Sequence, residues 1–423
     1  MHLVIGYFLP LAYLVILGWL FWKNNFFRVE GIRPAYSLAF LFGKIATGIL
    51  YTWVMIRFIP SAKADIDLFF GDGLQMYHQF FEDPAGFPAY LANLFHITDF
   101  DIGRTDSDFI RTVFEGIKFI HFLLNFLSGG QLFTNVLLFN GLAAWLFLRC
   151  WVYLKRLTGS WWAGGWLFLF PSGFFFTSVI LKEGIELSII AAIIPILAAP
   201  GPNKPAVRFI LLPFLFILLF FFKYLIAATF CTSLFLYLLY RKWPGQSMVT
   251  TLGAFLVGAI CFFGVGKIHP ALNLPQYIID RREEFQKLEA NTELTMRVLE
   301  PNAGSFARAL PEALTNVFIR PLPWEVEKIF YYAFWAELYG LWFLLGFLAL
   351  KAKGRLVESP GPELWAWLFF CLVNLVIIGF TITNTGAIIR YRSIFLPGVG
   401  CFLWVLWGGG RNRFGLLGKN LQP

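Results

Sequence analysis

The stretch FILLPFLFILLFFFKYLIAATFCTSLFLYLLY, residues 209–240, carries a single charge, Lys223. A bilayer core about 30 Å thick needs about 20 apolar residues per helix, so this stretch is long for one span and suits two short ones. An ionisable residue inside apolar sequence indicates function, unless it marks the tip of a helical hairpin. We therefore expect two short helices that meet at Lys223, with the lysine facing water at one membrane surface.

Apolar runs of this kind recur along the whole chain. Of its 423 residues 58% are hydrophobic and 19% aromatic, and the mean hydropathy is +0.67. The pattern predicts an all-α polytopic membrane helix bundle, one integral-membrane domain over 1–423 with about eleven spans. The expected spans are 2–22, 36–59, 131–152, 161–181, 184–199, 209–222, 224–240, 248–266, 328–350, 363–383 and 392–409. The short ones between 184 and 240 are expected to include broken or re-entrant helices.

Basic residues mark one side of the membrane. Alternate connections contain 16 of the 34 Lys and Arg residues and only three acids, and the positive-inside rule makes such connections cytoplasmic. The N-terminus is then outside and the C-terminus inside. The basic residues are Lys23, Arg28, Arg33, Arg149, Lys155, Arg156, Lys204, Arg208, Arg241, Lys242, Lys351, Lys353, Arg355, Arg411, Arg413 and Lys419.

The same alternation assigns the remaining polar stretches to the outer side. They are a first outer loop over 60–130, the turn 181–184, the junction Lys223–Tyr224, a second outer loop over 267–327, and 383–392. We expect these five segments to meet at one site, because a protein that only scaffolds has little cause to gather polar groups in this way.

Acidic residues begin the first outer loop, in DIDLFFGDGLQMYH (65–78). In an extended segment Asp65 and Asp67 share one face, and Gly71 and Gly73 let the backbone bend around Asp72. Such carboxylates could bind a divalent cation, with Asp67 and Asp72 as ligands, or act as a general base. The alternative is a solvated acidic loop or helix cap.

His78 follows in the same segment and could bind substrate, bind a metal or donate a proton, or be only a satisfied polar group in a loop. Farther along the loop, FEGIKFIHFLLNF (114–126) combines an apolar face with a few polar groups. That pattern is typical of a helix lying in the membrane interface, where it could form the floor of a lipid-binding groove.

Cations that could hold a phosphate occur in the other outer segments. Pro171 breaks a helix before Lys182 and Glu183, and Lys182 could bind a phosphate there. The alternative is that both residues are ordinary charges at a helix end. Arg320, in FIRPLPWE (318–325), could hold an anion against Trp324, or belong to a rigid turn with a Trp anchor.

The last outer segment is TNTGAIIRYR (383–392), which contains two arginines two residues apart. On a bent or extended link Arg390 and Arg392 could both point at one phosphate, and guanidinium groups suit that role. The alternative is a pair of anchors at the outer end of a span, although their position runs against the inside bias of basic residues.

Other readings of the composition are less favourable. The net charge of +9 could suggest nucleic acid, but the basic residues lie in connections between spans, where topology and anionic lipids explain them, so we expect no nucleic-acid partner. The five cysteines lie in or beside apolar segments without a CxxC pair, so we read them as small buried hydrophobes.

The order of these motifs resembles a known enzyme superfamily. An acidic first outer loop, the PS…KEG helix break (171–184) and RYRSIFLP (390–397) together resemble integral-membrane GT-C glycosyltransferases. RP.PWE and N.GA..RYR-like segments also make the chain similar to uncharacterised bacterial multi-spanning membrane proteins. The resemblance implies the bacterial inner membrane, a polyprenyl-phosphate-linked sugar donor and an acceptor at the outer face. Its first-loop carboxylate falls on Asp67 or Asp72, and its phosphate-binding cations fall on Lys182, Arg390 or Arg392.

Three rival functions fit the same pattern. An O-antigen-type polysaccharide polymerase or ligase also uses outer arginines on a lipid diphosphate, but needs no acidic loop. A lipid or solute transporter or flippase tends to have charges near mid-membrane and inverted repeats; here only Lys44 and Glu337 lie away from span ends, and no repeat is evident. A non-catalytic envelope protein fits everything except the gathering of polar segments.

Overall fold

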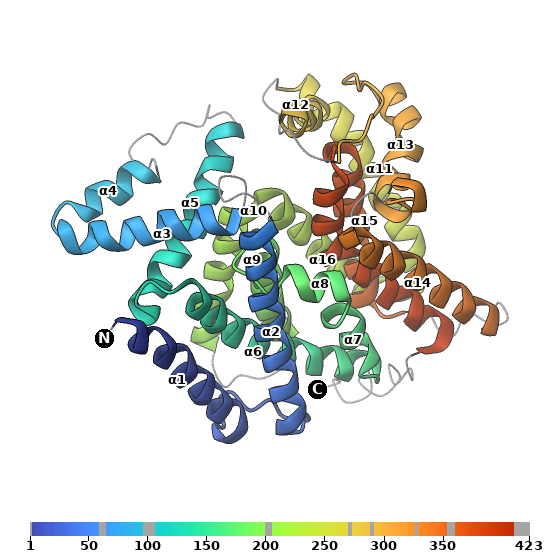
Figure 1. Ribbon diagram of the computed structural model, residues 1–423. Helices are drawn as coiled ribbons and strands as arrows, with labels where there is room; N and C mark the ends of the chain where they lie inside the picture. The colour runs from blue at the N-terminus through green and yellow to red at the C-terminus, as the bar shows by residue number, and fades with distance from the viewer. Residues whose placement is uncertain are drawn as a thin grey trace. The chain divides into compact units, whose positions relative to one another are not determined.

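The computed structural model describes residues 2–58, 65–95, 106–198, 205–269, 273–287, 292–325, 329–352 and 360–409. Throughout these ranges the ordered elements are helices, apart from one isolated β-bridge between Glu293 and Asn384, so the all-α prediction is confirmed. The chain divides into two compact units, 1–153 with 174–227, and 154–173 with 228–423. Each unit is described separately below (Figure 1).

The first unit begins with two long apolar helices and a helical hairpin. Its helices are α1 (His2–Lys23), α2 (Pro34–Phe58), α3 (Asp65–Glu82), α4 (Phe87–Leu94), α5 (Asp106–Ser128), α6 (Leu132–Thr158), α8 (Pro171–Phe176), α9 (Lys182–Ala198) and the first half of α10 (Pro205–Lys242). The helices α6, α8 and α10 continue across the boundary of the unit. The predicted first outer loop is therefore largely helical, with α3, α4 and α5 inside it.

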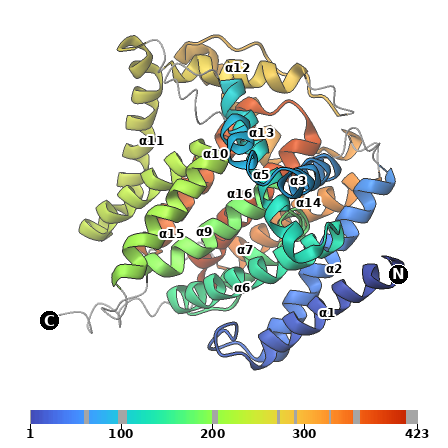
Figure 2. The same ribbon diagram turned by 90° about the vertical axis from the view of Figure 1, so that its left-hand side faces the viewer.

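The helices α3 and α5 pack along one another (Figures 1 and 2). Between them and α4 lies an apolar core centred on Met76, Phe87 and Phe122, each at most 5% exposed. Close approach depends on Gly73, where an added Cβ would lie 2.6 Å from both the Cβ of His121 and the carbonyl oxygen of Lys118. The glycine therefore lets α3 carry its polar face directly against α5.

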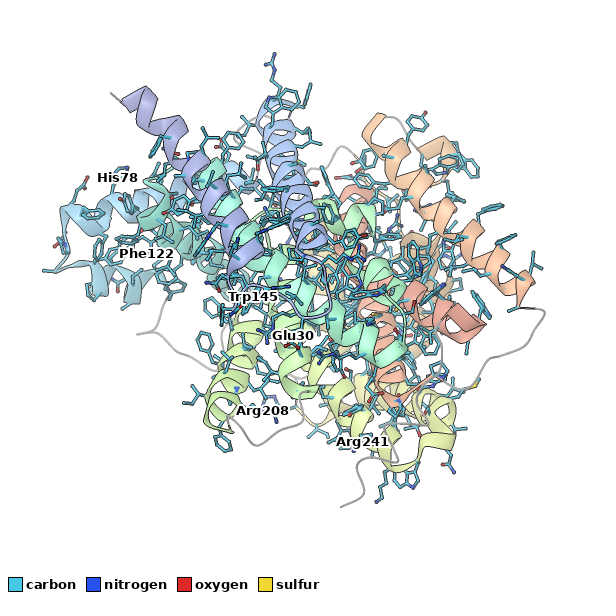
Figure 3. The ribbon with its side chains drawn as sticks, turned by 90° about the horizontal axis from the view of Figure 1, so that it is seen from below. Glu30, His78, Phe122, Trp145, Arg208 and Arg241 are labelled. Atoms are coloured by element: carbon cyan, nitrogen blue, oxygen red, sulfur yellow. The ribbon has the colours of Figure 1, made fainter. Side chains whose placement is uncertain are left out.

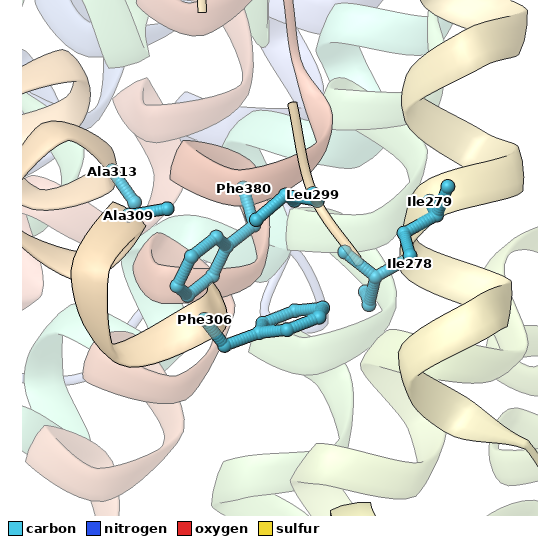
Figure 4. Packing of buried hydrophobic residues seen from close by; sticks show 7 residues of the cluster. All are labelled: Ile278, Ile279, Leu299, Phe306, Ala309, Ala313 and Phe380. Atoms are coloured by element: carbon cyan, nitrogen blue, oxygen red, sulfur yellow. The ribbon is translucent and has the colours of Figure 1, made fainter. Parts of the chain in front are cut away.

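The second unit contains α7 (Trp162–Phe168), the second half of α10, α11 (Ser247–Gly264), α12 (Leu274–Lys287), α13 (Ala303–Phe318), α14 (Ile329–Lys351), α15 (Pro362–Thr381) and α16 (Thr385–Trp404). Short helical turns lie at Pro244–Gln246, Val265–Lys267, Pro323–Glu325 and Val405–Gly409. One of its cores joins α12, α13 and α15 through Ile278, Phe306 and Phe380 (Figure 4). The predicted second outer loop thus contributes two helices to a packed core.

Seven helices in the described ranges are long and apolar enough to cross a membrane. Only 6% of the apolar window of α11 is buried inside the protein, against 78% for α16. A helix as apolar and as exposed as α11 is stable only in an apolar solvent, so the composition indicates an integral membrane protein. The seven candidate segments are Pro34–Phe58, Leu132–Thr158, Arg208–Lys242, Ser247–Lys267, Tyr331–Lys351, Pro362–Thr381 and Thr385–Trp407.

The expected total of about eleven spans is not confirmed, and two of the predicted spans differ from the structure. The predicted span 161–181 is wrong, because α7 and α8 are short helices separated at Leu169–Phe170 and followed by the non-helical residues 177–181. The last helix starts at Thr385 rather than at 392. At Lys223, α10 has φ −163° and ψ 87°, so the helix breaks at the residue where the sequence predicts two helices to meet.

Candidate functional site

The acidic stretch 65–78 lies on α3, so the expectation of an extended segment is wrong. Residues two apart on a helix point about 200° apart, and Asp65 and Asp67 therefore do not share a face. Asp65 is exposed, whereas Asp67 and Asp72 are partly buried. Gly71 and Gly73 lie within the helix rather than at a bend, and only Gly73 meets another element closely.

Asp72 forms an ion pair with Lys118 of α5, which sequence reasoning did not single out. The Nζ atom of Lys118 lies 2.8 Å from Oδ2 of Asp72 and 2.9 Å from Oε1 of Glu115. The Asp72 side chain is 36% exposed, whereas that of Glu115 is 7% exposed. Burial lowers the pKa of Lys118, but hydrogen bonds and charge from Asp72 and Glu115 outweigh it and raise the pKa above its usual value. The lysine therefore stays charged between a buried and an accessible carboxylate.

His78 is exposed on α3, edge-to-face with Tyr77 at 5.8 Å between ring centroids (Figure 3). Within the described residues no group of three or more His, Cys, Asp or Glu side chains could hold a metal ion, and so neither His78 nor Asp67 with Asp72 belongs to such a group. Two further acids of the predicted first outer loop, Asp99 and Asp101, lie outside the described residues.

A second charged group lies at the start of α9. Lys182 and Glu183 occupy the first turn, and both Glu183 and Glu186 are at most 1% exposed. Glu186 Oε1 is 3.8 Å from Nζ of Lys223, at the break in α10. The Lys223 side chain is 32% exposed, so this ion pair joins a buried carboxylate to a solvent-accessible amine.

Three of the five predicted outer segments are thus joined within the first unit. The Lys223–Glu186 pair links the break in α10 to the start of α9. Gly116 of α5 packs against Phe221 and Phe222, where an added Cβ would lie 2.6 and 3.2 Å from their rings. The helix that carries Glu115 and Lys118 therefore contacts α10 one or two residues before Lys223.

The other two segments are joined within the second unit. The amide of Leu294 donates to the carbonyl of Thr383 at 2.7 Å, and the amide of Thr385 donates to the carbonyl of Thr292 at 3.1 Å. Asn384 caps α16 by accepting from the amide of Ala387 at 2.7 Å. Because this cap starts α16 at Thr385, Arg390 and Arg392 lie within a helix and not on a bent or extended link between spans.

Arg390 and Arg392 do not form one fork, because both lie on α16, about 200° apart around it. Arg392 is 3% exposed, and its Nη1 donates to the carbonyl of Val317 at 3.2 Å and to the carbonyl of Arg320. It therefore satisfies carbonyls at the end of α13. Arg390 is partly buried, and its guanidinium lies 5.6 Å from the ring centre of Tyr391.

Arg320 is held by neighbours from its own segment. Its Nε lies 3.1 Å from Oε1 of Glu325, and its Nη1 donates to Oδ1 of Asn316 at 3.2 Å. Trp324 is 78% exposed, in agreement with an anchor in the membrane interface rather than a buried shelf.

No site role was assigned from the sequence to three charged residues that the fold places in polar contacts. Lys118 and Glu115 have the spacing of a helical ion pair, which was a usable signal, but their link to Asp72 depends on the hairpin. Glu337 of α14 accepts a hydrogen bond from the amide of Ser172 at 2.6 Å, so it caps the start of α8.

Comparison of the chain with protein-family models, with curated protein sequences and with solved structures found no match. The placement of the charged residues therefore carries the functional argument.

Proposed function

We propose that this protein is an integral-membrane glycosyltransferase that moves a sugar from a polyprenyl-phosphate donor to a cell-envelope acceptor. The observation that supports it most is the triad of Asp72, Lys118 and Glu115 on α3 and α5. It presents a partly exposed carboxylate, and α5 contacts α10 beside the Lys223–Glu186 ion pair. Carboxylates and cations are then available together on elements that touch.

In the proposed reaction Asp72 acts as the general base. The acceptor hydroxyl oxygen attacks the anomeric carbon of the sugar, the bond from that carbon to the phosphate oxygen breaks, and Asp72 takes the hydroxyl proton. Polyprenyl phosphate leaves with the bonding electron pair, and a nearby cation stabilises its charge. Lys182 and Lys223 are the candidate cations of the first unit, and Arg390 is the candidate of the second unit.

Asp72 is a better candidate for the base than Asp65 or Asp67. Its ion pair with Lys118 of α5 fixes the position of its carboxylate. The divalent cation that the sequence suggested on Asp67 and Asp72 forms no part of this proposal, because neither aspartate belongs to a group in the described residues that could hold a metal ion. The outer face of a bacterial inner membrane, with the N-terminus outside, remains the proposed location, and lipid-linked sugar and membrane lipids remain the proposed partners.

Purified protein in lipid nanodiscs tests this function directly. It is offered a panel of polyprenyl-linked sugars with extracted envelope acceptors, and released polyprenyl phosphate is measured with and without a chelator. We expect release with at least one donor. Release that needs Arg390 but not Asp72 would favour the polymerase or ligase instead.

Transport is the second candidate, because the first unit buries charged groups within its apolar helices. Lys44 and Glu183 are 0% exposed and Glu186 is 1% exposed, and such groups often mark ion or substrate paths in membranes. The same protein in sealed liposomes distinguishes the two functions. Movement of a labelled lipid-linked sugar between leaflets, without release of polyprenyl phosphate, would favour the transporter.

A further inference from the structure

The chain between α8 and α9 is non-helical although it is buried. Thr177, Ser178, Val179, Ile180 and Leu181 are each at most 1% exposed. Backbone polar groups outside a helix need hydrogen-bond partners in an apolar surrounding, because water is not there to supply them. Two side chains from other helices provide partners for this break.

Lys44 of α2 is one of them. It is 0% exposed, and its Nζ donates to the carbonyl oxygen and to Oγ1 of Thr177, both at 3.0 Å. The rings of Phe147 and Phe174 lie 4.8 and 5.1 Å from the same atom. In the described ranges, Lys44 has no ion pair with a carboxylate, and both of its hydrogen bonds go to Thr177 at the break.

Asn140 of α6 is the other. Its Nδ2 donates to the carbonyl of Ser178 at 2.7 Å. Gly48 lies one helical turn after Lys44, and a Cβ added there would overlap with the Ser178 carbonyl oxygen and lie 2.8 Å from Asn140 Nδ2. The helices α2 and α6 therefore both approach the break, and α2 does so through Lys44 and Gly48 on one face.

The break determines where α9 begins. Its five residues are followed directly by Lys182 and Glu183, and one turn later by Glu186, which faces Lys223. If the chain continued as a helix through 177–181, these charged residues would shift along the helix axis and point in other directions, since each residue turns a helix by about 100°.

We propose that Lys44 is a positioning residue, which holds the 177–181 break so that Lys182 stands where the donor phosphate binds and Glu186 stands where it pairs with Lys223. Its catalytic consequence rests on the proposed function. A methionine would fill the same apolar space without an amine, so the contribution specific to Lys44 is the pair of hydrogen bonds to Thr177.

Hydrogen exchange tests the positioning without any activity. Lys44→Met removes the donor, and Arg57→Met, an exposed position on the same helix, is the matched control. In nanodiscs we expect exchange of amides 178–184 to rise about tenfold in Lys44→Met, with no change in 115–128 of α5, because the opening is local. Unchanged exchange at 178–184, or an equal rise in both segments, would overturn the proposal.

A double-variant cycle and a kinetic split complete the test. Thr177→Val removes Oγ1, and its effect on exchange should vanish in the Lys44→Met background, because its partner is already gone.

In the transferase assay Lys44→Met should raise KM for the donor about tenfold with kcat within about twofold, as for loss of donor binding. A fall in kcat at constant KM would contradict the placement at the donor phosphate. If the wild type transfers no sugar, only the proposed function fails, and the exchange result still decides on Lys44.

Discussion

The ammonium group of Lys118 lies 2.8 Å from the carboxylate of Asp72 and thereby connects α5 to α3 across the helical hairpin. Glu115, on the same helix as the lysine, binds it from the other side at 2.9 Å. One cation therefore compensates two carboxylates, of which only Asp72 is accessible enough to meet a substrate. The predictions below separate the structural part of this arrangement from the catalytic part.

Removing the lysine should cost more stability than removing its accessible partner. Lys118→Met leaves Glu115 buried without its cation, so we expect the free energy of unfolding to fall by about 2 kcal/mol or more. Asp72→Asn should lower it by less than about 1 kcal/mol, since that carboxylate is partly solvated. Denaturant unfolding of the purified protein measures both. Recovery of stability in Lys118→Met with Glu115→Gln would confirm the cause, and equal losses in the two single variants would contradict it.

Close packing at Gly73 should be needed for the same ion pair. Gly73→Ala places a methyl group 2.6 Å from the backbone carbonyl of Lys118, so α3 must move away and stability should fall. Gly71→Ala is the matched control, because nothing lies within 4 Å of its added Cβ. There, alanine should stabilise α3 by up to about 1 kcal/mol. Thermal unfolding of both variants checks the contrast, and a loss of stability at Gly71 as large as at Gly73 would refute it.

Acid should destabilise the protein through His121. The side chain is 0% exposed on α5, and burial lowers its pKa from 6.5 to about 3. The folded state therefore binds this proton less readily than the unfolded state. Its contribution to stability is complete above pH 6.5 and decreases as the pH falls toward 3, by up to about 1.4 kcal/mol per pH unit.

Two histidine variants isolate this effect. His121→Gln should flatten the decline of unfolding free energy between pH 6.5 and pH 3, whereas His78→Gln should not, because His78 is exposed on α3. Denaturant unfolding over that range gives the comparison. An unchanged acid dependence in His121→Gln would show that other groups cause it.

The two arginines of α16 should behave differently. Arg392→Met leaves the carbonyls of Val317 and Arg320 without their donor, which should lower the unfolding free energy by about 1–3 kcal/mol. Arg390→Met should lower it by less, because Arg390 is only partly buried. If Arg390 binds the donor phosphate, only its variant combines a native fold with reduced transfer. Stability and transfer that fall together in both variants would point to a structural role for both.

The helical class and most long helices followed from apolar runs alone, because a span of about 20 apolar residues has few alternatives. The helix α3 was missed although its signal was present: Ile66, Phe69, Gly73 and Met76 are buried at helical spacing. Gly71, Gly73 and the closely spaced Asp65 and Asp67 indicated an extended segment with a bend instead. In 161–181 the sequence indicated a break at Pro171 but not the non-helical stretch 177–181 that follows α8.

The candidate site was predictable in residue types but not in partners. Lys223 was expected at a break and lies there, since a single lysine in a long apolar run has few other solutions. The pairing of Asp72 with Lys118, and of Arg392 with carbonyls of α13, joins residues remote in sequence. Such pairs depend on how helices pack, and periodicity within one helix does not contain that information.

The central claim is tested most directly by the rate of polyprenyl phosphate release in nanodiscs, for the wild type, Asp72→Asn and Glu82→Gln. Glu82 is an exposed acid in the last turn of the same helix and serves as the control. We expect release by the wild type, a fall of about 100-fold or more in Asp72→Asn, and a change within about twofold in Glu82→Gln, as for loss of a general base. Release by Asp72→Asn at the wild-type rate, or no release with any donor, would contradict the account.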